Sequence, residues 1–161
     1  MKLYLIRHAS ALNVGQEGIF QDEARRLSVK GVEEAEKIGR FLKSLKIKVD
    51  LILHSPLIRA EQTANKISEA LSVERKVENK LSTEFGLQSY MEALDEHKFV
   101  QNLVMVAHQP TLSKMALTMM GSDPRAGLEV NPGSIIMLRS ERLSSTWTGQ
   151  LSLLISPSEM A

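Results

Sequence analysis

The stretch Leu3-Tyr4-Leu5-Ile6-Arg7-His8 takes four apolar residues directly into an arginine and a histidine. The pattern recurs twice, because Val49 to Leu53 is followed by His54-Ser55-Pro56 and Leu103 to Ala107 is followed by His108. Short apolar runs bounded in this way are typical of buried parallel strands. In open α/β sheets, functional groups collect at the carboxyl ends of strands. We therefore expect these polar residues to converge on one crevice that suits an anion, and phosphate above all.

The rest of the chain alternates between helical and strand patterns. Helical spacing of apolar residues covers 32–45, 57–71 and 112–119, with a weaker pattern from Leu87 to His97. Further strands are expected at 73–77, 134–139 and 147–155, the last two as an edge hairpin. The polar stretch 9–26 reads as a loop over the crevice. This order predicts an α/β fold, a three-layer α/β/α sandwich with a mostly parallel sheet and helices on both faces.

Composition narrows the class of protein. The 161 residues suffice for one domain spanning 1–161, and the net charge of +1 demands neither a nucleic-acid nor a membrane partner. The absence of cysteine excludes disulfides, thiolate metal sites and a cysteine-dependent phosphatase. No apolar run has the length of a membrane span, and the N-terminus lacks the features of a signal peptide. A cytoplasmic protein, most simply a monomer, is expected.

His8 has two interpretations. One histidine at a strand end is most often structural. The functional interpretation is a nucleophile, because a neutral imidazole can attack phosphorus and form a phosphohistidine. Arg7 would then hold the non-bridging phosphate oxygens with its planar fork.

Arg59 and His108 extend the same site. Ser55 is expected to cap a helix with Pro56 at its first position, which puts Arg59 in a first turn where free amides already favour an anion. His108, when protonated, would be a cationic phosphate ligand. The competing functional interpretation is a metal site, which needs histidines and carboxylates at ligand spacing, and the chain has no such set. We therefore expect no metal and no cofactor.

Three motifs resemble those of a known family. Arg7-His8-Ala9 resembles the Arg-His-Gly signature of the histidine phosphatase superfamily, which has the phosphoglycerate mutase-like fold. The segment Ser55 to Ala64 is similar to its second motif, and Val106 to Pro110 resembles its third. The resemblance implies that His8 is the phosphorylated nucleophile, and that Arg7, Arg59 and His108 complete a catalytic phosphate pocket. Ser55 and Gln109, within these motifs, become candidate substrate-binding residues.

Within that superfamily, the chain looks closest to the SixA-type phosphohistidine phosphatases. Asp22 to Gly31 resembles that branch's Asp-x-x-Arg-Pro-Leu-Thr/Ser-x-x-Gly segment, so Arg25 takes the place of a substrate-binding pocket arginine. Arg26 replaces the proline, and Ala9 replaces the glycine of the first motif.

The expected general acid of the family is displaced. Many small-molecule phosphatases of the superfamily carry a glutamate two residues after a leucine, where Leu81-Ser82-Thr83 places a threonine, and Glu84 comes one residue late. Phosphohistidine releases an imidazole, which needs less protonation than an alkoxide. The sequence therefore favours a metal-independent phosphatase that removes phosphate from phosphohistidine on a protein partner, such as a histidine phosphotransfer domain. Two alternatives remain: a small-molecule phosphomonoesterase with Glu84 as its acid, and a non-catalytic phosphate-binding protein.

Overall fold

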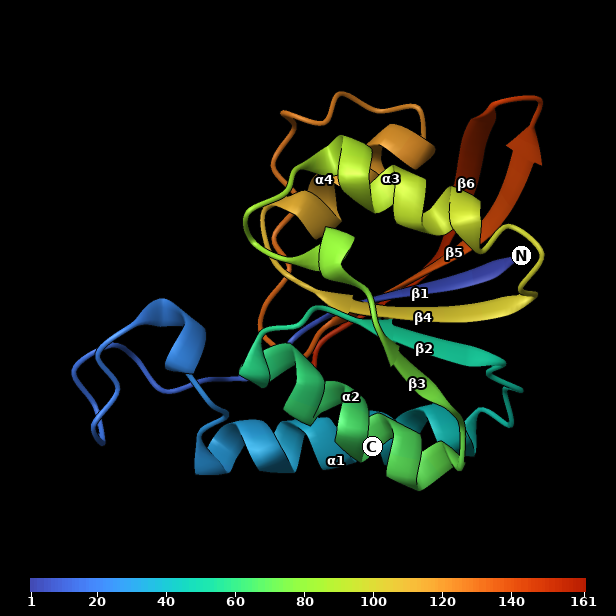
Figure 1. Cartoon of the computed structure of the whole chain (residues 1–161). Helices are drawn as coiled ribbons and strands as arrows, with labels where there is room; N and C mark the ends of the chain where they lie inside the picture. Colours follow the sequence, from blue (N-terminus) through green and yellow to red (C-terminus); the bar gives the residue numbers. More distant parts are fainter.

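The computed structural model describes residues 1–161 and is built around one six-stranded sheet (Figure 1). The strands are β1 (Lys2–Arg7), β2 (Leu51–His54), β3 (Arg75–Val77), β4 (Asn102–Ala107), β5 (Ile135–Leu143) and β6 (Thr146–Ile155). The helices are α1 (Val29–Ser44), α2 (Ile58–Leu71), α3 (Leu87–Glu96) and α4 (Thr111–Met119), with 3-10 turns η1 (Asp22–Ala24) and η2 (Asn79–Leu81). None of the helices is both long and apolar enough to cross a bilayer.

The order of strands across the sheet is β3-β2-β4-β1-β5-β6. The first four are parallel to one another, whereas β5 is antiparallel to β1 and β6 is antiparallel to β5. Helices α1 and α2 cover one face, and α3 and α4 cover the other (Figure 1). The expected three-layer α/β sandwich with a mostly parallel sheet and an edge hairpin is confirmed.

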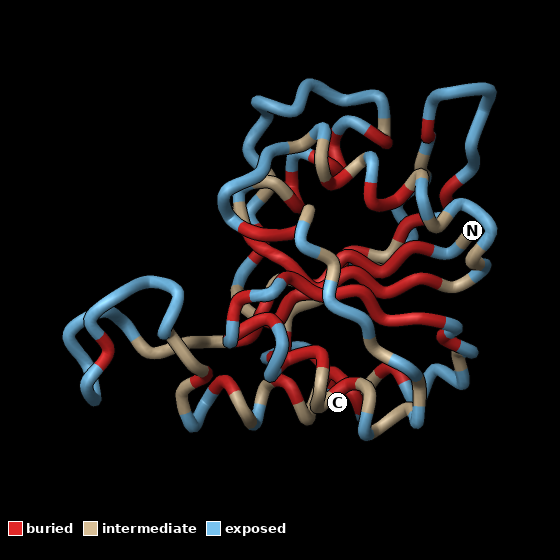
Figure 2. Tube along the Cα trace, viewed as in Figure 1, coloured by how far each residue is buried: buried red, intermediate tan, exposed pale blue.

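The hydrophobic core lies on both faces of the central strands (Figure 2). Alternate residues of β1 serve the two layers: Tyr4 and Ile6 pack beneath α1 and α2, and Leu3 and Leu5 pack beneath α3 and α4. This explains why β1 reads as a continuous apolar run rather than an alternating one.

One local expectation is wrong. Helix α2 begins at Ile58 with Leu57 as its N-cap residue, so Ser55 does not cap it and Pro56 is not its first residue. The Ser55 hydroxyl instead accepts a hydrogen bond from the Leu57 amide, at 3.3 Å, in a tight turn that precedes the helix. Arg59 nevertheless lies in the first turn of α2, as expected.

Candidate active site

The carboxyl ends of β1, β2 and β4 lie side by side. Arg7 at the end of β1 is paired in register with Ala107 at the end of β4, and His54 at the end of β2 is paired with Val106. The residues that directly follow β1, β2 and β4 are His8, Ser55 and His108, respectively. The ring centroids of His8 and His108 are 5.2 Å apart, so the sheet brings the two histidines into one crevice.

His8 is held as a neutral ring with a defined tautomer. Its Nδ1 lies 2.8 Å from the carbonyl oxygen of Ala9, which can only accept a hydrogen bond, so Nδ1 carries the proton and Nε2 keeps its lone pair. Burial, and then the charges of Arg59, Arg7 and Arg25, lower the pKa of His8 to about 4, although its hydrogen bond to Ala9 opposes this. An unprotonated Nε2 near neutral pH is the state that a nucleophile requires.

Thr63 of α2 secures the backbone beside His8. Its hydroxyl accepts a hydrogen bond from the Ala9 amide at 3.1 Å and donates one to the Arg59 carbonyl at 2.7 Å. The side chain therefore ties the end of β1 to the first turn of α2. Thr63 belongs to the second sequence motif, but the motif alone did not predict this contact.

His108 is also buried and neutral. Its Nε2 lies 2.7 Å from the Ser55 hydroxyl, and its Nδ1 has no protein partner. Burial lowers the pKa of His108 to about 3, with further lowering from His8 and Arg59. The neutral ring is therefore the favoured state of His108 in the free protein. An anion placed beside the ring would raise this pKa, because negative charge stabilises the imidazolium.

Three arginines add positive charge to the crevice. Burial lowers the pKa of Arg7, and the nearby charges of Arg25 and Arg59 lower it further, so both of these guanidinium groups lie close enough to Arg7 to repel it. The Nε atoms of Arg7 and Arg59 are buried without a protein partner, as is Nδ1 of His108. Buried polar atoms usually have a hydrogen-bond partner. This cluster of free donors and positive charge is suited to an oxyanion.

Asp22 is the one carboxylate that contacts these arginines. Its Oδ2 lies 3.0 Å from Nη2 of Arg59, and its Oδ1 lies 3.0 Å from Nη1 of Arg25. Its backbone carbonyl also accepts a hydrogen bond from Nη1 of Arg59 at 2.9 Å. Burial alone would raise the pKa of Asp22, but the two arginines outweigh it and lower the pKa. Asp22 begins the loop motif in the sequence, but the motif did not predict these contacts with Arg59 and Arg25.

Two further arginine contacts fix the guanidinium groups. Nη1 of Arg7 donates to the Val130 carbonyl at 2.9 Å, and Nε of Arg25 donates to the Leu12 carbonyl at 2.7 Å. Each of these guanidinium groups is thereby held by a backbone carbonyl, and its remaining N–H groups can contact a ligand. Val130 has no polar side chain, so no sequence signal pointed to this contact.

The remaining candidates are less closely associated with the crevice. The side-chain oxygen of Gln109 accepts hydrogen bonds from the amide and hydroxyl of Ser113, so it supports the first turn of α4 and leaves only its amide nitrogen for a ligand. Glu84 is exposed on the turn between η2 and α3, and no hydrogen bond or ion pair joins its side chain to a crevice residue. No three histidine or acidic side chains are grouped so that they could hold a metal ion.

Comparison with protein families gives a match over residues 3–88 to the histidine phosphatase superfamily, branch 1. Phosphohistidine phosphatase SixA of Escherichia coli is 28% identical over 116 residues, which are 68% of this chain and 68% of that protein. A SixA homolog of Haemophilus influenzae is 28% identical over 152 residues, which are 86% of this chain and 87% of that protein.

Two solved structures show the same fold. The protein histidine phosphatase SixA complexed with tungstate superimposes with a TM-score of 0.84 at 20% identity, covering 100% of both chains. A mycobacterial glucosyl-3-phosphoglycerate phosphatase complexed with VO3 gives a TM-score of 0.76 at 17% identity, covering 94% of this chain and 97% of that one. The fold is therefore shared by phosphatases named for a protein histidine and for a small sugar phosphate.

Proposed function

The chain belongs to the histidine phosphatase superfamily, and on that premise we propose that it removes phosphate from phosphohistidine on a protein through a covalent intermediate at His8. The observation that carries the proposal is the tautomer of His8. Its Nδ1 proton is committed to the Ala9 carbonyl, so the lone pair of Nε2 is free to attack phosphorus beside three guanidinium groups.

In the first step, Nε2 of His8 attacks the phosphorus atom of the substrate. A new P–N bond forms, the P–N bond to the substrate imidazole breaks, and its electron pair stays on that imidazole nitrogen, which takes a proton from solvent. Arg7, Arg25 and Arg59 stabilise the negative charge on the equatorial oxygens of the phosphoryl group, where charge gathers during transfer. No metal ion is required for this charge stabilisation.

In the second step, water attacks the phosphorus atom of phosphorylated His8. The P–Nε2 bond breaks, its electron pair returns to Nε2, and inorganic phosphate leaves with the oxygen of the water, whose proton passes to solvent. His108 is proposed to support both steps through Nδ1, which has no protein partner. In the tautomer with the proton on Nδ1, this atom donates a hydrogen bond to a phosphoryl oxygen, and the Ser55 hydroxyl donates one to Nε2.

The proposed substrate class follows from the leaving group. An alkoxide leaving group needs a general acid. Thr83 and Glu84 are both exposed, and neither side chain makes a hydrogen bond or ion pair with a residue of the crevice. An imidazole departs with less help, so a site without a positioned acid suits cleavage of a P–N bond. Similarity to the phosphohistidine phosphatases of Escherichia coli and Haemophilus influenzae supports the same class.

A direct comparison of substrates tests this proposal. The purified protein would be assayed in parallel on a phosphohistidine-bearing phosphotransfer domain and on a panel of sugar phosphates and phosphoglycerates. We expect the highest kcat/KM on the phosphohistidine protein and no turnover in His8→Asn. Preferential hydrolysis of a sugar phosphate would show that the protein is a small-molecule phosphatase. Binding without turnover of any substrate would show that it is a phosphate-binding protein.

A further inference from the structure

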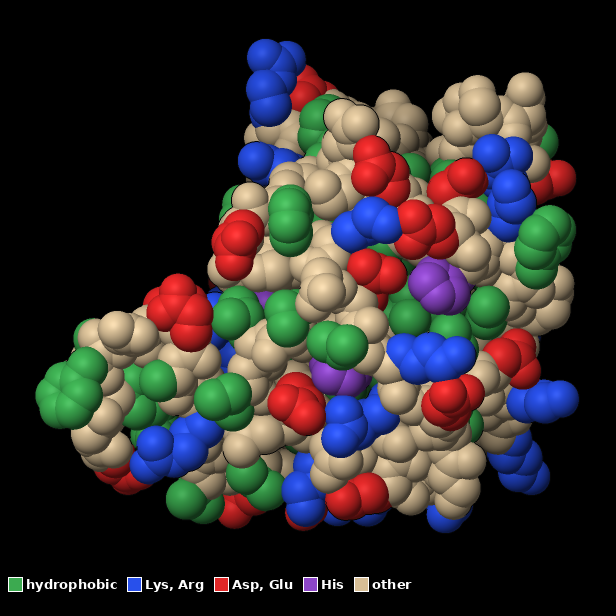
Figure 3. Space-filling model, in the orientation of Figure 1, with side chains coloured by type: hydrophobic (Ala, Val, Ile, Leu, Met, Phe, Trp, Pro, Cys, Tyr) green, Lys and Arg blue, Asp and Glu red, His purple; other side chains and the backbone are tan.

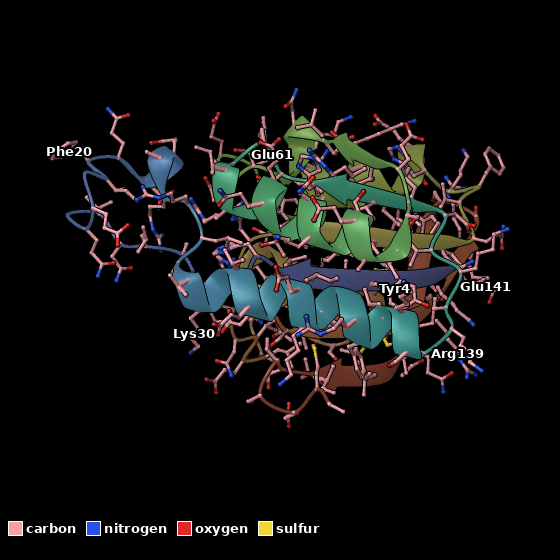
Figure 4. All side chains as sticks on the ribbon, turned by 90° about the horizontal axis from the view of Figure 1, so that it is seen from below. Tyr4, Phe20, Lys30, Glu61, Arg139 and Glu141 are labelled. Carbon is pink, nitrogen blue, oxygen red and sulfur yellow. The ribbon has the colours of Figure 1, made fainter.

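The loop between β1 and α1 stands away from the body of the molecule (Figure 1). It carries Phe20, whose side chain is 83% exposed, and the exposed Val14. Figure 4 shows Phe20 at the far end of this loop, and Figure 3 shows apolar side chains gathered on that end of the molecule. Exposing a phenyl ring to water is unfavourable, and removal of its surface from water on binding is favourable.

The loop is ordered rather than loosely attached. Ser10 donates to the Glu34 carboxylate through both its amide and its hydroxyl, at 2.8 and 3.1 Å. Nearer the tip, the Gly15 amide donates to the Ile19 carbonyl at 2.7 Å, and the Ile19 side chain is buried beside the exposed Phe20. A partner that binds Phe20 would therefore lose little free energy in ordering the loop.

Two of the exposed apolar residues also lie close in sequence to side chains of the phosphate pocket. Phe20 is two residues from Asp22, whose carboxylate contacts Arg59, and a chain advances at most about 3.6 Å per residue, so the two Cα atoms are within about 7 Å. Ile58, which is exposed, directly precedes Arg59. We call Val14, Phe20 and Ile58 the apolar rim.

We propose that the apolar rim docks the folded protein that carries the phosphohistidine, with Phe20 as its anchoring side chain. The inference rests on the proposed function. A phosphorylated imidazole is attached through a short side chain to its own backbone, so the surface of the carrier protein must approach the rim when the phosphoryl group reaches Arg59. A free sugar phosphate in the pocket has no surface that extends to the loop. Exposed aromatic side chains beside polar contacts are typical anchors of protein interfaces.

The test compares two substrates with the same leaving group. One is a histidine phosphotransfer domain phosphorylated with phosphoramidate, and the other is free phosphohistidine. The measured quantity is the ratio of kcat/KM for the domain to kcat/KM for free phosphohistidine. Phe20→Ala is compared with Phe99→Ala, a matched control because Phe99 is 84% exposed and precedes the amino end of β4, whereas the crevice lies beyond the carboxyl end of that strand.

We expect the ratio to fall about tenfold in Phe20→Ala and to keep its wild-type value in Phe99→Ala, as for loss of an interface anchor. An unchanged ratio in Phe20→Ala, or an equal fall in both variants, would overturn the docking role while leaving the proposed function intact. Failure of the wild-type protein to act on the phosphorylated domain would instead overturn the proposed function, and the rim with it. A wild-type dimer in sedimentation that Phe20→Ala converts to a monomer would assign the rim to self-association.

Discussion

The carboxylate of Asp22 and the guanidinium of Arg59 form an ion pair at the entrance to the phosphate pocket, with Oδ2 and Nη2 3.0 Å apart. The same carboxylate contacts Arg25. Arg25 and Arg59 thereby share one negative charge, which offsets part of the positive charge gathered beside Arg7. The pair also connects the projecting loop to the first turn of α2.

Removal of this carboxylate should weaken catalysis. In Asp22→Ala, Arg25 loses its ionic partner and Arg59 loses one of its two contacts with the loop. Both guanidinium groups should therefore be less well oriented. Charge-assisted hydrogen bonds that are partly exposed contribute about 1 kcal/mol, so kcat/KM on nitrophenyl phosphate should fall roughly fivefold to tenfold. Glu23→Ala is the control, because Glu23 is an exposed neighbour with no such contact. Equal or higher activity in Asp22→Ala would contradict this role.

The Ser55 hydroxyl should matter through His108. Ser55→Ala leaves the buried Nε2 of His108 without its 2.7 Å partner, and an unsatisfied buried group costs about 1–3 kcal/mol. We expect kcat to fall about tenfold with a smaller change in KM, measured by steady-state kinetics. Ser113→Ala removes the hydroxyl's hydrogen bonds to the Gln109 side chain and the Pro110 carbonyl at the start of α4, and it serves as a control for hydroxyl loss outside the histidine pair. Similar losses of kcat in both variants would remove the special role of Ser55.

Protonation of the two histidines gives a pH prediction. Burial lowers the pKa of His8 to about 4 and that of His108 to about 3, from an ordinary value of 6.5. The rings should therefore stay neutral from about pH 8 to about pH 5.5, which NMR of labelled histidines would show. Inorganic phosphate should raise the pKa of His108. Midpoints near 6.5 for either ring in the free protein would show that these pKa values are wrong.

The same shifts predict how stability depends on pH. Because the folded pKa values lie below the unfolded value, the unfolded chain takes up protons first as the pH falls below 6.5. Each histidine then contributes full stability above that pH. His8 loses this contribution as the pH falls toward 4 and His108 as it falls toward 3, with a cost of about 2 kcal/mol per ring at pH 5. Denaturant unfolding at pH 7 and pH 5 measures this, and equal free energies of unfolding would contradict it.

Glu84 tests the leaving-group argument. Glu84→Gln should barely change phosphohistidine hydrolysis, because an imidazole departs without an acid. Nitrophenyl phosphate should be processed better than sugar phosphates by both forms, since nitrophenolate leaves unprotonated. Strong sugar-phosphate turnover that collapses in Glu84→Gln would identify Glu84 as a general acid and contradict the proposed substrate class.

Much of this arrangement was predictable from residue patterns. The apolar runs that end at Arg7 and Ala107 predicted buried parallel strands, and the pairing of these two residues in the sheet is what brings His8 and His108 together. Arg59 was predictable because an arginine at a helix start is electrostatically unusual. The prediction of the strands succeeds because the ends of strands follow from local periodicity.

Other contacts could not be predicted in this way. Ser55 precedes proline in a pattern typical of a helix cap, but the turn it forms, and its contact with His108, depend on a strand almost fifty residues later in the chain. Asp22 lies in a loop without periodicity, and its ion pair with Arg59 depends on how the loop folds back. The Val130 carbonyl that orients Arg7 is a backbone atom, which no residue type can indicate.

The most direct test of the account is identification of the phosphorylated residue. The protein would be mixed with a radiolabelled phosphohistidine domain, quenched within a single turnover under alkaline conditions that preserve P–N bonds, and digested for peptide mapping. The account predicts one phosphoryl group on Nε2 of His8, and neither label nor turnover in His8→Asn. Label on another residue, or full turnover by His8→Asn, would contradict it.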